Sequence, residues 1–175
     1  GAQIFADIIP QAIASLPAAI KAKLHITQQA REDNINKLKE AYEAQNISYE
    51  VARFYHDMPA LFEASDIIIS RAGASSVQEI ATAGRASLLV PFAGALDDHQ
   101  TGNAMSLATI GGALVIAEAE ANAMNIASLL TGLITDGEQR AKMAKNAQSL
   151  SMHNAGTAIA ELAGLNAPHR TGAML

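Results

Sequence analysis

The feature that most constrains the fold of this chain is a series of short, apolar-rich runs separated by longer segments with helical periodicity. Most of the runs are apolar throughout, which is typical of strands buried on both faces of a sheet. Strands that alternate with helices favour parallel pairing through crossover connections. Strands are expected at 23–28, 47–54, 66–70, 87–92 and 113–117. The sequence therefore predicts an α/β fold with a doubly wound, Rossmann-like parallel sheet.

Helices are expected between the strands and beyond the last one. The predicted ranges are 3–22, 30–45, 58–64, 76–83 and 98–110, with two or three further helices over 122–165. The chain thus opens on a helix, whereas a fold of this type should place a strand before it, and we expect that an N-terminal part has been removed. The segment 166–175 has no periodicity and is expected to be a loose tail.

Composition narrows the possible partners and chemistry. The 175 residues include no cysteine, which excludes a disulfide framework, a thiolate nucleophile and a cysteine-based zinc site. The formal net charge is -5, and acidic residues are scattered among basic ones, so nucleic acid is not an expected partner. No apolar run reaches the ~18–20 residues that a membrane-spanning helix requires.

The loop 71–76 carries the strongest site signal, because it joins a predicted strand to a predicted helix. In an open parallel sheet, ligands bind beyond the carboxyl ends of the strands, where this loop would lie. Gly73 allows a turn, and the small neighbouring side chains allow a ligand to approach the backbone. The free amide groups and the positive dipole end of the following helix suit an anion such as a diphosphate.

Glu79 allows two interpretations. The segment 76–79 fits the S-x-x-E pattern of a capping box, in which Glu79 would fold back onto the amide of Ser76. Alternatively, its carboxylate accepts two hydrogen bonds from a ribose diol. The residue types alone leave both interpretations open.

The segment 97–100 (DDHQ) precedes another predicted helix. An aspartate there could cap the helix, while His99 and Gln100 could project into the cleft as ligands of a sugar. His99 is not a convincing metal ligand, because no second histidine or carboxylate lies four residues further on. We therefore expect no metal site and no cofactor.

Several segments together resemble one family, the bacterial peptidoglycan N-acetylglucosaminyltransferases (MurG). The resemblance spans residues 1 to about 165 and depends on the order in which the segments occur. They are 54–58 (FYHDM), 64–74 (ASDIIISRAGA), 79–84 (EIATAG), 89–92 (LVPF) and 98–104 (DHQTGNA). The resemblance implies that residues 1–165 are the C-terminal, donor-binding half of a GT-B glycosyltransferase, in which two doubly wound domains enclose the active site.

The resemblance also implies roles for individual residues in binding UDP-N-acetylglucosamine (UDP-GlcNAc). Tyr55 would present its backbone to uracil, and Glu79 would bind the ribose hydroxyls. The diphosphate and ribose would be lined by Ala74, Ser75, Ser76, Val77, Gln78 and Glu79. His99 and Gln100 would contact the transferred sugar. The family has glutamine at the position of His99, and Tyr55 and Ser75 also depart from its usual pattern.

The resemblance further implies that the intact protein is an inverting hexosyltransferase of cell-wall synthesis. Members of the family move GlcNAc from UDP-GlcNAc onto undecaprenyl-diphospho-MurNAc-pentapeptide, converting lipid I to lipid II. The second half of a member opens with a strand and a glycine loop, G-G-S-x-G-A, of which Gly1-Ala2 matches only the tail. The catalytic base and the contacts to the lipid-linked acceptor would belong to an N-terminal half, so we expect the chain to be inactive alone. The intact enzyme would be peripheral, on the cytoplasmic face of the bacterial inner membrane.

Two other functions remain open from the sequence. One is a different UDP-sugar enzyme that shares the fold. The other is a noncatalytic nucleotide-sugar module that works only with a separate partner subunit, an alternative made concrete by the expected loss of an N-terminal half.

Overall fold

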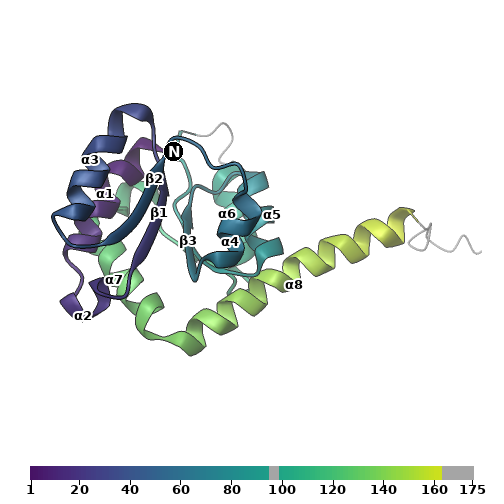
Figure 1. Cartoon of the computed structure of the whole chain (residues 1–175). Coiled ribbons are helices and arrows are strands. Elements are labelled where there is room, and N and C mark those ends of the chain that lie inside the picture. The colour runs from purple at the N-terminus through teal and green to yellow at the C-terminus, as the bar shows by residue number, and fades with distance from the viewer. Residues whose placement is uncertain (95–98, 163–175) are drawn as a thin grey trace, which may run out of the picture.

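The structure, a computed structural model, describes residues 1–94 and 99–162, with side chains as far as Ser151 (Figure 1). The helices are α1 (Gln3–Ala14), α2 (Ala18–Lys21), α3 (Glu32–Glu43), α4 (Met58–Ala64), α5 (Ala74–Ala83), α6 (His99–Ala108), the 3-10 helix η2 (Glu118–Glu120), α7 (Ala123–Thr135) and α8 (Gly137–Leu162). The strands are β1 (His25–Gln29), β2 (Ser48–Ala52), β3 (Ile67–Ser70), β4 (Ala86–Leu89) and β5 (Leu114–Val115). The predicted tail at 166–175 and the proposed aspartate cap at 97–98 lie outside the described residues.

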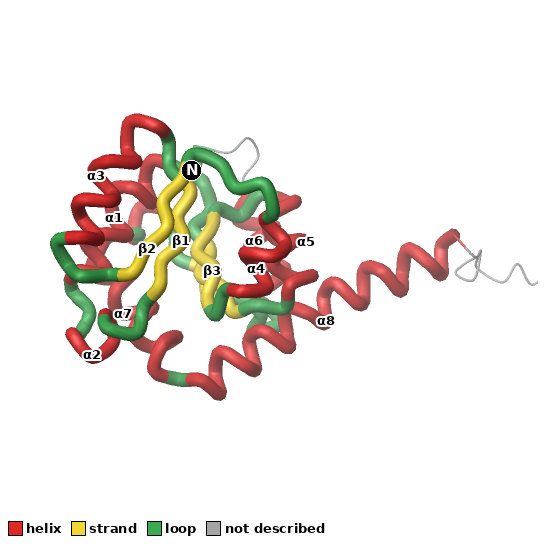
Figure 2. The backbone as a smooth tube through the Cα atoms, in the orientation of Figure 1, coloured by secondary structure: helices red, strands yellow, loops and turns green. Residues whose placement is uncertain are grey.

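All strand pairs are parallel, and they form two hydrogen-bonded sheets. In the first sheet β1 pairs with β2, and in the second the order is β3-β4-β5. Figure 2 shows β1 and β3 next to each other in the middle of the molecule. Aliphatic side chains of both strands, Ile26 and Ile67 among them, pack against the same hydrophobic cluster. The predicted α/β fold with parallel strands is therefore confirmed. In the described residues, no ladder of hydrogen bonds joins β1 to β3.

The middle strand of the second sheet is buried on both faces. Leu88 of β4 and Val90 just after it belong to one core cluster, which also contains residues of α1 and α7. Leu89 belongs to a second cluster, formed with residues of α5 and α6. Successive side chains of a strand point to opposite faces, so two clusters along one strand mean an apolar layer on each side. This confirms the prediction of burial on both faces for β4, whereas in β1 His25, Thr27 and Gln29 are exposed.

The helices accordingly lie on two sides of the strands. Figure 1 shows α1, α3 and α7 together on one side and α4, α5 and α6 on the other. The long helix α8 packs against α5 and β4. The loops at the carboxyl ends of the strands form the candidate site.

Several helix boundaries differ from the prediction. Helix α3 is shorter at both ends than the predicted 30–45, and α6 ends at Ala108 rather than at 110. The predicted helix 3–22 is divided in two, because Pro17 is the N-cap of a separate helix, α2, a position where its missing N–H costs little. Helix α5 begins at Ala74, two residues before the predicted start, with Gly73 as its N-cap.

Candidate functional site

At the start of α5, beyond the carboxyl end of β3, backbone donors have no hydrogen-bond partner among the described residues. Val77 makes the first intrahelical hydrogen bond, from its amide to the carbonyl of Gly73 at 3.0 Å. The amides of Ala74, Ser75 and Ser76 precede it and have no intrahelical acceptor. Within the described part of the chain no side chain caps this end, and the first turn of α5 contains no acidic residue. The positive end of the helix dipole is thus unneutralised, which suits a bound anion.

The capping-box interpretation of 76–79 is wrong in this structure. Because the helix begins at Ala74, Ser76 is its third residue rather than its N-cap, and Gly73 has no side chain to cap with. Glu79 lies in the second turn of α5 and is exposed. Its carboxylate makes no hydrogen bond or ion pair with any residue that the structure describes. The second interpretation, in which the carboxylate accepts hydrogen bonds from a ribose diol, stays a prediction.

Gln100 links the loop after β3 to the loop after β4. Its side-chain oxygen Oε1 accepts a hydrogen bond from the amide of Ala72 at 3.2 Å and another from the amide of Phe92 at 3.0 Å. Both partners are donors, so the atom they share must be the carbonyl oxygen, and the NH2 group remains at the other end of the side chain. Gln100 can therefore contact a ligand only as a hydrogen-bond donor while both loops are held.

A second residue of α6 holds the same loop. Asn103 donates from Nδ2 to the carbonyl of Ala72 at 3.1 Å. Together with the Gln100 contact, this fixes both polar groups of the Ala72 backbone just before α5 begins. The loop that leads into α5 is thereby held by α6, and Gln100 lies beside this loop. His99, the first residue of α6, is exposed.

Tyr55 lies at the carboxyl end of β2, on the other sheet. Its hydroxyl donates to the carbonyl of Glu50 at 3.0 Å, and burial, with the nearby Glu50 carboxylate as a smaller cause, raises the pKa of the phenol. The ring is thus tied back to β2. The neighbouring Phe54 is 63% exposed and lies edge-on to His56, with 5.1 Å between ring centroids. Among the described residues, no hydrogen bond joins Tyr55 to α5 or to Gln100.

Arg71 and Glu118 form a charged pair that the sequence did not single out. Arg71 Nη2 lies 2.5 Å from Glu118 Oε1, and Arg71 Nη1 donates to the carbonyls of Val90 and Pro91, each at 3.2 Å. Glu118 Oε2 accepts from the amide of Ala93 at 2.8 Å. The hydrogen bond from Arg71, and then that from Ala93, lowers the pKa of the Glu118 carboxyl. The only sequence signal was an acidic residue directly after a predicted strand.

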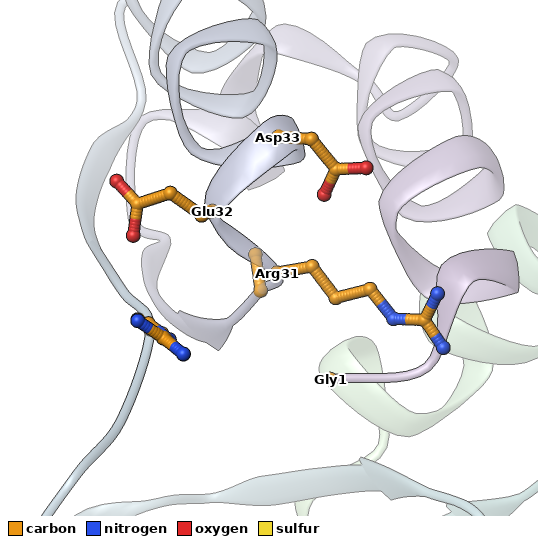
Figure 3. Close-up of a pocket in the computed structure, with 6 residues that line it drawn as sticks. Gly1, Arg31, Glu32 and Asp33 are labelled. Carbon is orange, nitrogen blue, oxygen red and sulfur yellow. The ribbon is translucent and has the colours of Figure 1, made fainter.

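Two neighbouring pockets open at this edge. One, of about 400 Å³, is lined by Ala2, Gln3, Ile4, Arg31, Arg71, Phe92, Gln100 and Glu118. The other, of about 460 Å³, is lined by Gly1, Ala30, Arg31, Glu32, Asp33 and Arg53. Figure 3 shows the side chain of Arg31 extending toward Gly1, with Glu32 and Asp33 on the first turn of α3. Arg31 belongs to both linings, so the two pockets adjoin at its side chain, beside the start of α1.

The described residues contain no cluster of three or more His, Cys, Asp or Glu side chains arranged to hold a metal ion. Within the same part of the chain, no helix combines the length and the apolar character needed to cross a membrane.

Residues 1–162 match the C-terminal domain of glycosyltransferase family 28. The chain is 43% identical over 171 residues to the UDP-N-acetylglucosamine--N-acetylmuramyl-(pentapeptide) pyrophosphoryl-undecaprenol N-acetylglucosamine transferase of Mesorhizobium japonicum, and 37% identical over 174 residues to the enzyme of the same name from Rhodospirillum rubrum. These matches cover 98% and 99% of this chain but 46% and 45% of the relatives. The chain thus spans about half the length of the curated relatives it matches.

Solved structures agree with this relationship. The crystal structure of Acinetobacter baumannii MurG matches with a TM-score of 0.77 and 31% identity, over 93% of this chain and 46% of that one. The glycosyltransferase VinC, solved in complex with dTDP, matches with a TM-score of 0.64 at 16% identity, which supports the fold alone. The chain belongs to glycosyltransferase family 28, as the C-terminal domain of a GT-B fold.

Proposed function

We propose that this domain binds the nucleotide-sugar donor of a peptidoglycan glycosyltransferase, UDP-GlcNAc. The observation that carries the proposal is the uncapped start of α5, where the amides of Ala74, Ser75 and Ser76 face the edge at which parallel sheets bind ligands. A diphosphate supplies the negative charge that this helix end favours. The names of the relatives support the choice of UDP-GlcNAc over other nucleotide sugars.

The remaining residues are assigned to the parts of the donor that flank the diphosphate. The uncommitted carboxylate of Glu79 would accept hydrogen bonds from the ribose hydroxyls. The NH2 group of Gln100, with His99 beside it, would donate to the sugar. Val77 and Gln78 would complete the α5 contact, and the backbone at Tyr55 would face uracil from the end of β2. Because the Tyr55 hydroxyl is occupied by Glu50, its backbone rather than its phenol is the group proposed to bind.

For the whole protein we propose an inverting transfer of GlcNAc from UDP-GlcNAc to undecaprenyl-diphospho-MurNAc-pentapeptide. The acceptor hydroxyl attacks the anomeric carbon while UDP leaves, and negative charge grows on the leaving phosphate. Backbone donors fixed at the start of α5 would stabilise that charge, and one donor lost from a preorganised anion site costs ~3 kcal/mol. The base and the acceptor contacts would come from an N-terminal domain. The intact enzyme would act as a peripheral protein on the cytoplasmic face of the inner membrane.

The test of donor binding is an NMR titration of the 15N-labelled chain with UDP-GlcNAc. We expect the largest shifts at the amides of 72–79 and at the side-chain NH2 of Gln100, with smaller responses to UDP and to free GlcNAc. A response to UDP that equals the response to UDP-GlcNAc at Gln100 would remove the sugar contact. No response to either ligand at millimolar concentration would remove the donor assignment for this chain.

A further inference from the structure

Glu118 connects the loops that follow three adjacent strands. It lies three residues beyond β5, while Arg71 directly follows β3 and Ala93 follows the β4 segment. One carboxylate oxygen contacts the Arg71 guanidinium and the other accepts from the Ala93 amide. Because β3, β4 and β5 are hydrogen-bonded neighbours in that order, a side chain from the third strand secures the ends of the first and the second.

Arg71 is committed to the protein rather than free for a ligand. One terminal nitrogen is shared between the carbonyls of Val90 and Pro91, and the other faces Glu118. The guanidinium carbon also lies 5.7 Å from the ring centre of Phe5 and 5.2 Å from that of Phe92, within cation–π range. The Arg71 and Glu118 side chains are 18% and 23% exposed, so loss of Glu118 would leave a largely buried cation without its counter-charge.

The pair is continuous with the candidate donor site. Ala72, next to Arg71, and Phe92, next to Ala93, both donate to the Oε1 atom of Gln100. Arg71, Phe92, Gln100 and Glu118 all line the same pocket. The orientation of the Gln100 amide therefore depends on two loop amides whose positions depend on Glu118.

We infer that Glu118 is a positioning residue: through Arg71 and the Ala93 amide it fixes the loops 70–74 and 90–93, and so aims the NH2 group of Gln100 and the start of α5 at the ligand. The structural part of this inference stands on the contacts above, while its consequence for UDP-GlcNAc rests on the proposed function. Glu118 does not itself touch the donor in this account.

The test compares Glu118→Ala and Glu118→Gln with a matched control, Glu120→Ala. Glu120 lies on the same 3-10 helix, is exposed, and its side chain makes no hydrogen bond or ion pair within the described part of the chain. In the absence of ligand, hydrogen exchange at the Ala93 and Ala72 amides and the NMR signals of the Gln100 side chain report on the loops directly. Signal dispersion elsewhere in the spectrum checks that each variant is folded.

We expect Glu118→Ala to speed exchange at the Ala93 amide and to weaken UDP-GlcNAc binding, each by about tenfold, with a smaller effect on binding of UDP. Glu118→Gln keeps an oxygen that can accept from Ala93 or from Arg71, so it should recover part of both losses. Glu120→Ala should match the unsubstituted chain. Unchanged exchange at Ala93 and unchanged Gln100 signals in folded Glu118→Ala would overturn the inference, as would loosened loops with full affinity for UDP-GlcNAc.

The two proposals fail in different ways. If the unsubstituted chain does not bind UDP-GlcNAc, the proposed function fails, but the exchange and side-chain signals still decide whether Glu118 holds the loops. If the chain binds UDP-GlcNAc and Glu118→Ala binds it equally well, the positioning role fails and donor binding stands.

Discussion

The carboxylate of Glu79 is the side chain on which the proposed ribose contact depends. It is exposed on α5 and has no hydrogen-bond or ion-pair partner among the described residues, so its loss breaks no such contact in that part of the chain. Hydrogen bonds to a charged group contribute ~1.5–3 kcal/mol, so we expect Glu79→Ala to weaken UDP-GlcNAc binding roughly 10- to 100-fold without lowering the melting temperature. Isothermal titration calorimetry and thermal unfolding measure the two effects.

Glu138→Ala is the control for the loss of one negative charge, since Glu138 is exposed at the start of α8. It should leave the affinity unchanged, and Glu79→Gln should fall between Glu79→Ala and the unsubstituted chain. An equal loss in Glu138→Ala would mean that net charge, rather than a ribose contact, explains the effect of Glu79.

The lowered pKa of Glu118 predicts how stability changes in acid. Because the folded-state pKa lies below the ordinary value of 4.5, the pair stabilises the fold fully above about that pH, and the contribution is lost as the pH falls through the lowered value. We expect the free energy of unfolding to fall less steeply with decreasing pH in Glu118→Gln than in the unsubstituted chain below pH ~4.5. Urea unfolding at a series of pH values measures this, and identical slopes would contradict the prediction.

Residues of the site were predictable from the sequence where the signal is local, and not where it depends on tertiary pairing. Gln100 stands directly at a predicted helix start, and the structure places its side chain between the loops after β3 and β4. Glu118 was missed because its partner Arg71 is 47 residues away, and the two meet only through the order of the second sheet. The two ends of the Gln100 amide also could not be assigned from the sequence. That its oxygen is held while its NH2 group is available follows only from the positions of two loop amides.

At the scale of elements, α5 depends on a left-handed residue at its end. Gly84 is the C-cap with φ +58°, and a Cβ atom built there would lie 3.2 Å from Cβ of Gln148 on α8. We expect Gly84→Ala to destabilise the chain by more than about 1 kcal/mol, because an L side chain is strained in this conformation and crowds α8. Denaturant unfolding measures the change.

Gly132 provides the opposite control. It lies inside α7, and a Cβ atom there would meet nothing within 4 Å. Gly132→Ala should therefore stabilise the chain by about 0.5–1 kcal/mol. Similar effects of the two substitutions would contradict the role of the Gly84 conformation.

The interval between β1 and β3 suggests that the domain has another strand. In the described structure β1 pairs only with β2 and β3 only with β4, although both pack on the same core. A Cβ atom built on Gly1 would lie 2.1 Å from the carbonyl oxygen of Gln29, so the chain passes close against the carboxyl end of β1. We propose that residues preceding Gly1 form a parallel strand between β1 and β3, which would give the doubly wound order 3-2-1-4-5-6.

An N-terminal extension of nine residues that favours a strand, joined to Gly1, tests this proposal. We expect slower amide exchange along β1 and β3 and a higher unfolding midpoint. The same extension with two prolines in its middle should give neither, since proline cannot donate to a ladder. Equal protection of β1 and β3 in both extended chains would contradict the proposed strand, as would protection that appears only with dimerisation.

Element types were predictable from the sequence to a greater extent than element ends. Every predicted strand is present, because runs of aliphatic residues between helical segments are a strong signal. The start of α5 was misplaced because the S-x-x-E pattern at 76–79 also fits a capping box. The contacts of Gln100 and Asn103 to Ala72, which hold the turn in front of Ala74, lie too far along the chain to be visible in a local pattern.

At the scale of the whole molecule, the alternation of strand and helix determined the fold class, and the two core clusters on either side of β4 explain why. The order of the strands in the sheet could not be predicted in the same way, because it is set by crossover paths rather than by composition. The division of the sheet between β1 and β3 was therefore not predicted as a feature of the structure, even though a strand before the first helix was expected.

A crystal structure of the chain bound to UDP-GlcNAc tests the central claim most directly. The account predicts the diphosphate on the amides of Ala74–Ser76, the ribose on Glu79, the Gln100 NH2 group on the sugar and uracil beside the backbone of Tyr55. A donor bound elsewhere, or at this edge with its diphosphate away from the start of α5, would contradict it.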